Sequence, residues 1–106
     1  MLSVEQVIKL CEEDVRIRFR RKPRSDKLKG EYDPEDNEIS VYLKNIDSKE
    51  ERDITILHEF IHARDIWIKN LDTTGSCSER VEREATETYK KRPEVLAFIK
   101  EMYKIK

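Results

Sequence analysis

Residues 54–68 read ITILHEFIHARDIWI and form a long helical pattern. Apolar residues recur here at the three- and four-residue steps of a helix, namely Ile54, Leu57, Ile61 and Ile68. Two histidines and a glutamate lie inside the pattern rather than in a loop. We therefore predict one long helix that ends near Lys69 and carries these polar side chains on its turns.

The residues on either side of this helix indicate where neighbouring elements begin. Asp47 or Ser48 can cap its start, with Glu51 completing a capping box after Ser48. Downstream, residues 71–78 read as a loop whose Ser78 can cap a helix from Glu79 to about Lys91. Pro93 suits a first helical position and opens a fourth helix in the remaining segment, up to Lys106.

Residues before the long helix predict a helix and a small sheet. Apolar spacing and a possible Ser3–Gln6 capping box indicate a helix over 4–13, and strict alternation indicates a strand over 15–20 that Pro23 closes. Turn-forming residues at 33–37 separate two further strands, about 28–32 and 38–44. We predict one α+β domain over residues 1–106: an N-terminal helix, a three-stranded sheet and three helices.

Length and composition narrow the class of protein. A chain of 106 residues leaves no room for a separate cofactor domain, and only Gly30 and Gly75 are available for a phosphate-binding loop. We find neither a long apolar run nor a signal peptide, so we expect a cytoplasmic protein without membrane partners. Abundant Glu and Lys with a single Gln and three Asn favour a thermophilic source.

Charge is distributed unevenly although the formal net charge is only -1. Eight basic residues and one acid lie between Arg16 and Lys29, and five acids without a base lie between Glu31 and Glu38. A basic stretch beside an acidic one favours a solvated sheet face with cross-strand ion pairs over a nucleic-acid surface. A nucleic-acid partner is the alternative interpretation.

The sequence His58-Glu59-Phe60-Ile61-His62 has the HExxH arrangement. Residues four apart lie on one helical face, so both imidazoles can reach one ion, and Glu59 can contact a water molecule beside it. Two neutral imidazoles suit zinc, which lowers the pKa of water toward about 7. We predict Zn²⁺ as cofactor, His58 and His62 as ligands, and Glu59 as the catalytic general base.

A catalytic zinc ion needs a third protein ligand, and no third histidine exists. The candidates are carboxylates and one thiol downstream of the motif: Asp72, Cys77, Glu79, Glu82, Glu84 and Glu87. Helical phase places Glu82 beside the apolar arc of its helix, Glu84 on the other edge, and Glu79 opposite. We therefore favour Glu82, with Glu84 as the main alternative.

HEFIH followed by Glu82-Arg83-Glu84-Ala85-Thr86 resembles the gluzincin zinc metallopeptidases. Length and element order are similar to the minigluzincins, short archaeal scaffolds related to the cores of integral-membrane metallopeptidases. The resemblance implies His58, His62 and Glu82 as zinc ligands and Glu59 as general base. Many relatives carry Asp or Asn where this chain has Thr86, and Asp65 is the candidate to support His62 instead.

The resemblance also implies latency, either by obstruction from the C-terminal helix or by self-association. We expect a zinc-dependent metalloendopeptidase acting on a peptide or protein that pairs with the strand at 38–44 as a sheet edge. Tyr89 and Tyr103 are candidates to stabilise the developing oxyanion. The alternatives are a metallopeptidase-like domain with a nucleic-acid or repressor partner, and a zinc-stabilised fold without catalysis.

Overall fold

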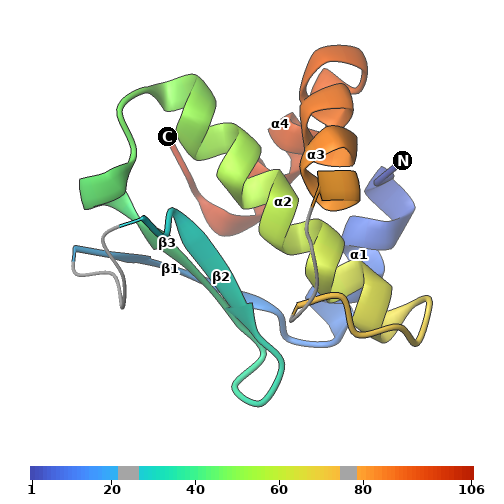
Figure 1. Cartoon of the computed structure of the whole chain (residues 1–106). Helices are drawn as coiled ribbons and strands as arrows, with labels where there is room; N and C mark the ends of the chain where they lie inside the picture. Colours follow the sequence, from blue (N-terminus) through green and yellow to red (C-terminus); the bar gives the residue numbers. More distant parts are fainter. Residues whose placement is uncertain (22–26, 75–78) are drawn as a thin grey trace.

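The computed structural model describes residues 1–21, 27–74 and 79–106, and it confirms the predicted α+β order (Figure 1). The elements in chain order are α1 (Val4–Glu12), β1 (Arg16–Arg20), β2 (Gly30–Asp33), β3 (Glu38–Tyr42), the 3-10 turn η1 (Leu43–Asn45), α2 (Lys49–Trp67), α3 (Glu79–Lys91) and α4 (Pro93–Tyr103). The long helix ends at Trp67, two residues before the predicted end, and Asn70 beyond it has a φ of 55°.

The sheet has the strand order β1-β3-β2, with β3 parallel to β1 and antiparallel to β2. The prediction that residues 38–44 form an edge strand is therefore wrong, because β3 is the central strand. All five residues of β3 are buried. Among the described strands, β1 and β2 form the two edges.

Local capping chemistry explains several element boundaries. Ser3 and Gln6 form the predicted capping box of α1, and the Ser48 side chain accepts from the Glu51 backbone N–H at 3.1 Å to start α2. Asn37 closes the β2–β3 turn with a left-handed φ of 53°. Pro93 opens α4 as predicted, whereas the predicted cap Ser78 and the closing Pro23 lie outside the described residues.

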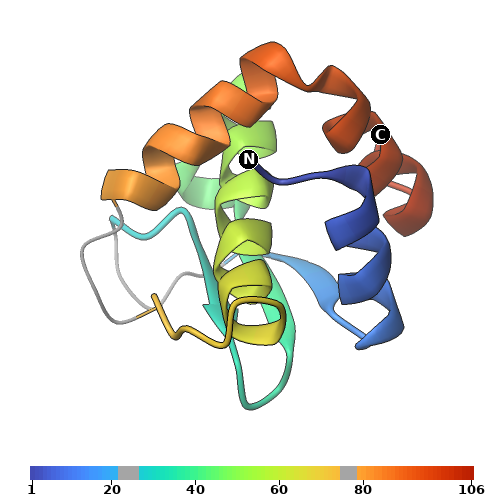
Figure 2. The same ribbon diagram turned by 90° about the vertical axis from the view of Figure 1, so that its right-hand side faces the viewer.

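Helix α2 lies between the sheet and the other helices (Figure 1). Turned by 90°, Figure 2 shows α3 crossing one side of α2 and α1 and α4 lying together on the other side. Buried side chains from the sheet and all four helices form one core, in which Ile39, Phe60 and Ile99 have no exposed surface. No helix within the described ranges combines the length and the apolarity needed to cross a bilayer.

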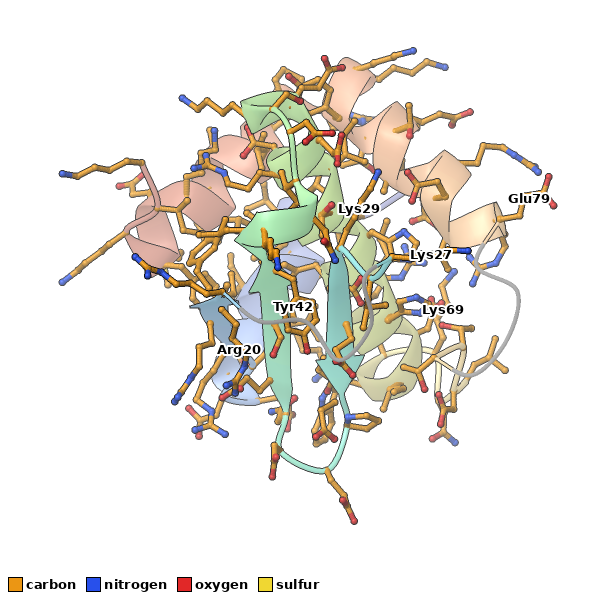
Figure 3. All side chains as sticks on the ribbon, turned by 60° about the vertical axis from the view of Figure 1, so that its left-hand side comes forward. Arg20, Lys27, Lys29, Tyr42, Lys69 and Glu79 are labelled. Atoms are coloured by element: carbon orange, nitrogen blue, oxygen red, sulfur yellow. The ribbon has the colours of Figure 1, made fainter. Side chains whose placement is uncertain are left out.

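The outer face of the sheet carries the predicted cross-strand ion pairs. Arg20 on β1 donates to Glu38 on β3 at 2.7 Å and to Ser40 at 3.1 Å, and Arg18 lies 3.5 Å from Glu38. Tyr42 on the same face hydrogen-bonds Glu31 of β2 (Figure 3). The basic and acidic stretches thus pair with each other across the described strands. Glu38, Ser40 and Tyr42 of β3 are buried, however, so the exposed part of this face is formed by the arginines of β1. The basic residues within 22–26 lie outside the described residues.

Candidate metal centre

The two histidines of the HExxH motif face each other on successive turns of α2. The Nε2 atoms of His58 and His62 are 3.2 Å apart, and the ring centroids are 4.9 Å apart. Two nitrogen ligands on a tetrahedral zinc ion, each about 2.05 Å from the metal, lie about 3.3 Å from each other. The distance between the Nε2 atoms therefore suits two ligands of one ion.

The other ring nitrogen of His58 contacts α3. Its Nδ1 lies 2.7 Å from a carboxylate oxygen of Glu82, whose side chain is 58% exposed. The hydrogen bond with His58 lowers the pKa of Glu82, so this carboxylate is ionised at neutral pH and can only accept. His58 must therefore carry a proton on Nδ1.

The other ring nitrogen of His62 contacts the loop after α2. Its Nδ1 lies 2.8 Å from the Thr73 hydroxyl, which donates to Asp65 at 3.0 Å. Asp65 therefore supports His62 as suggested from the sequence, but indirectly, through a threonine that sequence reasoning missed. A threonine in a loop carries no spacing signal that could have identified it beforehand.

This arrangement directs both Nδ1 atoms toward oxygens and both Nε2 atoms toward each other. Burial lowers the pKa of His58, but the Glu82 hydrogen bond and the Glu59 charge outweigh it and raise the pKa above its ordinary value. Burial and the charge of His58 lower the pKa of His62 to about 4. The space between the Nε2 atoms thus needs one positive species, either the proton of His58 or a cation that replaces it.

Glu59 lies beside His58 and is almost completely buried, with 4% of its surface exposed. Burial raises its pKa to about 7, although the charge of His58 opposes this. Gly30 on β2 permits this placement, because a Cβ there would lie 2.7 Å from the Thr55 side chain and 2.9 Å from the Ser40 carbonyl oxygen. A larger residue at position 30 would push β2 away from α2 and Glu59.

Two surface hollows of about 540 and 450 Å³ meet at this site, because both are lined by Gly30, His58 and Glu59. Glu82 lines the first hollow and His62 lines the second. Strand β2 forms a wall of the second hollow, whose lining includes Tyr32. An extended chain could therefore lie along β2 and pass both histidines.

The other candidate third ligands have different surroundings. Glu84 accepts from Arg64 and, at 3.4 Å, from Arg80, so an ion pair occupies its carboxylate. Asp72 accepts from Thr74, Glu87 lies more than one turn beyond Glu82, and Cys77 lies outside the described residues. Glu79 is exposed and points away from the sheet (Figure 3). Glu82 is the candidate that the structure brings to a motif histidine.

The candidate third ligand, Glu82, does not point to the space between the two Nε2 atoms. Within the described ranges, no three His, Cys, Asp or Glu side chains converge on one point that could hold a metal ion. The reason is geometric, since Glu82 contacts Nδ1 of His58, whereas the paired Nε2 atoms lie on the far side of the ring. The two imidazoles fit zinc as they stand, and Glu82 fits only after its side chain rotates.

Neither predicted oxyanion residue lies at this site. Tyr103 donates to the Val15 carbonyl at 2.5 Å and packs edge-on against Phe60 in the core. Tyr89 lines a separate hollow beside α4. Tyr32, which sequence reasoning did not single out, lines the hollow that contains His62, and its hydroxyl donates to Asn37 at 2.6 Å.

Helix α4 does not line either hollow that contains His58. Its Val95, Leu96 and Ile99 are buried in the core, and Lys100 binds Asp53 of α2 at 2.9 Å. In this arrangement the C-terminal helix completes the core and leaves the hollows open, so latency by self-association stays a prediction.

Comparisons of the chain with protein-family models, curated proteins and solved structures found no match. We therefore base the function on the geometry of the site.

Proposed function

We propose that the protein is a zinc-dependent metalloendopeptidase of the HExxH gluzincin type. One observation carries the proposal: two imidazole Nε2 atoms lie 3.2 Å apart beside a buried carboxylate, where two hollows meet next to a sheet edge. The pair of nitrogens suits zinc, the carboxylate suits proton transfer, and the sheet edge suits an extended peptide.

His58 and His62 would hold the ion through Nε2, and Glu82 would be the third ligand. Glu82 must leave Nδ1 of His58 and adopt another rotamer, and this change is feasible because more than half of its side chain is exposed. Bound zinc would polarise a peptide carbonyl and lower the pKa of water.

Glu59 would act as the general base and then as the general acid. A carboxylate that accepts a proton from the attacking water must later deliver it to the leaving amine. Burial raises its pKa to about 7 in the metal-free protein, which favours a carboxyl group that can both accept and release a proton near neutral pH.

The substrate would pair with the edge of β2 that no described strand covers. The Tyr42 backbone N–H donates to the Lys29 carbonyl at 2.8 Å, and the direction of backbone groups alternates along a strand. Lys29, Glu31 and Asp33 therefore direct their backbone groups toward β3, whereas Gly30 and Tyr32 direct theirs toward the open edge. These two residues would bind the peptide main chain beside the histidines.

Metal analysis of purified protein tests the zinc assignment. We expect one zinc per chain in the wild type, loss of zinc in His58→Ala, and at least tenfold weaker binding in Glu82→Ala. Glu79→Ala is the matched control, because Glu79 lies on the same helix but is exposed and points away. A wild type that holds no zinc and cannot be refilled would overturn the proposal.

Hydrolysis separates a peptidase from a zinc-stabilised fold. We expect Glu59→Gln to retain zinc and to lose cleavage of casein, because only the proton acceptor is removed. Wild-type activity that increases on dilution would indicate latency by self-association. A wild type that binds zinc but cleaves nothing at any dilution, with Glu59→Gln indistinguishable from it, would contradict the peptidase assignment.

A further inference from the structure

Asp65 is the most enclosed carboxylate near the candidate site, with no exposed surface. One of its oxygens accepts from Arg64 at 2.8 and 3.2 Å, and the other accepts from Arg80 at 2.8 Å and from Thr73 at 3.0 Å. Burial would raise its pKa, but these hydrogen bonds outweigh burial and lower it. Asp65 is therefore ionised and has no proton to donate.

The position of a single proton follows from this ionisation. A threonine hydroxyl has one hydrogen, and an ionised carboxylate can only accept, so Thr73 gives its hydrogen to Asp65. The Thr73 oxygen can then interact with His62 only as an acceptor, at 2.8 Å from Nδ1. His62 must supply the hydrogen from Nδ1, which leaves the lone pair on Nε2.

We infer that Thr73 and Asp65 form a relay that locks His62 in the Nδ1–H tautomer, so that its Nε2 is always available as a metal ligand. This role rests on the proposed function, because the lock serves a cation bound at Nε2. Thr73 acts through His62 and is thus a positioning residue. Thr73 lies 11 residues beyond His62 in the sequence and contacts its Nδ1. Its neutral hydroxyl thus takes the position in which many metal sites have a carboxylate.

The same carboxylate connects this relay to α3. Arg80 of α3 binds Asp65 of α2, and Arg64 of α2 binds Glu84 of α3 at 3.0 Å. These two ion pairs cross between the helices in opposite directions and fix the first turns of α3 against α2. Because Glu82 lies two residues after Arg80, the group that orients His62 also helps to place Glu82.

Thr73→Val and Thr73→Ser test the relay. Valine keeps the shape of threonine without the hydroxyl, whereas serine keeps the hydroxyl. The first measurement is the imidazole nitrogen spectrum of His62 in metal-free protein at neutral pH, because the ¹⁵N shifts distinguish the two tautomers. The second is zinc affinity, with circular dichroism to confirm folding.

We expect a pure Nδ1–H tautomer in the wild type and in Thr73→Ser, and a mixture in Thr73→Val. Zinc affinity should fall about 10- to 100-fold in Thr73→Val and recover in Thr73→Ser. A wild-type His62 protonated on Nε2, or a Thr73→Val spectrum identical to that of the wild type, would overturn the relay even if zinc binds. A locked tautomer that Thr73→Val loses, in protein that never binds zinc, would support the relay and overturn the proposed function.

Discussion

The two histidines of the motif differ in how firmly the protein holds them. His62 is held by Thr73 and Asp65, both buried, and Asp65 is fixed in turn by two arginines. His58 is held by Glu82, whose side chain is mostly exposed at the edge of a hollow. One half of the site is thus preorganised, and the other half can rearrange when a ligand arrives.

The largest expected effect of this difference between His62 and His58 is on the free energy of unfolding. Asp65→Asn removes one of the two carboxylates that pair with Arg64, which is 1% exposed, and also the carboxylate that binds Arg80, so we expect a loss of about 3 kcal/mol in the free energy of unfolding. Glu82→Gln removes an exposed partner and should cost less than about 1 kcal/mol. Urea denaturation of metal-free protein measures both. Equal losses for the two variants would show that the two halves are equally rigid.

Glu59 lies between the two halves and should change stability with pH. Its pKa rises from an ordinary 4.5 to about 7 on folding because it is buried, so the folded protein binds its proton more tightly than the unfolded chain does. The carboxyl therefore stabilises the fold fully below its unfolded pKa, and this contribution is lost as pH rises through about 7. The difference between the two pKa values corresponds to about 3 kcal/mol.

Glu59→Gln should consequently be more stable than the wild type at high pH. We expect a gain of up to about 3 kcal/mol near pH 8 and little difference near pH 4, measured with a chelator present. His62 has the opposite pH dependence because its pKa is lowered, but it is present in both proteins and cancels in the difference. If the difference in the free energy of unfolding between Glu59→Gln and the wild type does not change with pH, then burial does not raise the pKa of Glu59.

The strongly periodic parts of the fold could be predicted from the sequence. The bounds of α3 and the start of α4 follow from apolar spacing and Pro93, and the HExxH spacing places both imidazoles on one face of α2. The order of the strands could not be predicted, because alternation in 15–20 and 38–44 suits either an edge or a central position. The parallel pairing of β1 with β3 depends on the tertiary arrangement alone.

The sequence singled out candidate site residues that lie on helices, where spacing fixes the face of each side chain, and missed those that lie on a loop or an edge strand. Helical phase distinguished Glu82 from Glu84, and in the structure Glu82 contacts His58 whereas Arg64 binds Glu84. Thr73 and Tyr32 reach the site through a loop and an edge strand, and no periodicity links either one to the motif. Whether Glu82 coordinates zinc stays a prediction.

A substitution on the outer face of the sheet should have the smallest effect on stability. It also tests whether the candidate metal centre depends on the ion pairs of that face. Arg20 is about 42% exposed and binds Glu38, which Arg18 also approaches, so Arg20→Gln should cost less than about 1 kcal/mol. Lys9→Gln, which removes another exposed cation, is the control. Zinc affinity should not change, because Arg20 lines a hollow that contains neither histidine. A loss of zinc affinity in Arg20→Gln alone would show that strain in the sheet reaches α2 through β3, and the firm half of the site would then depend on the sheet as well as on Asp65.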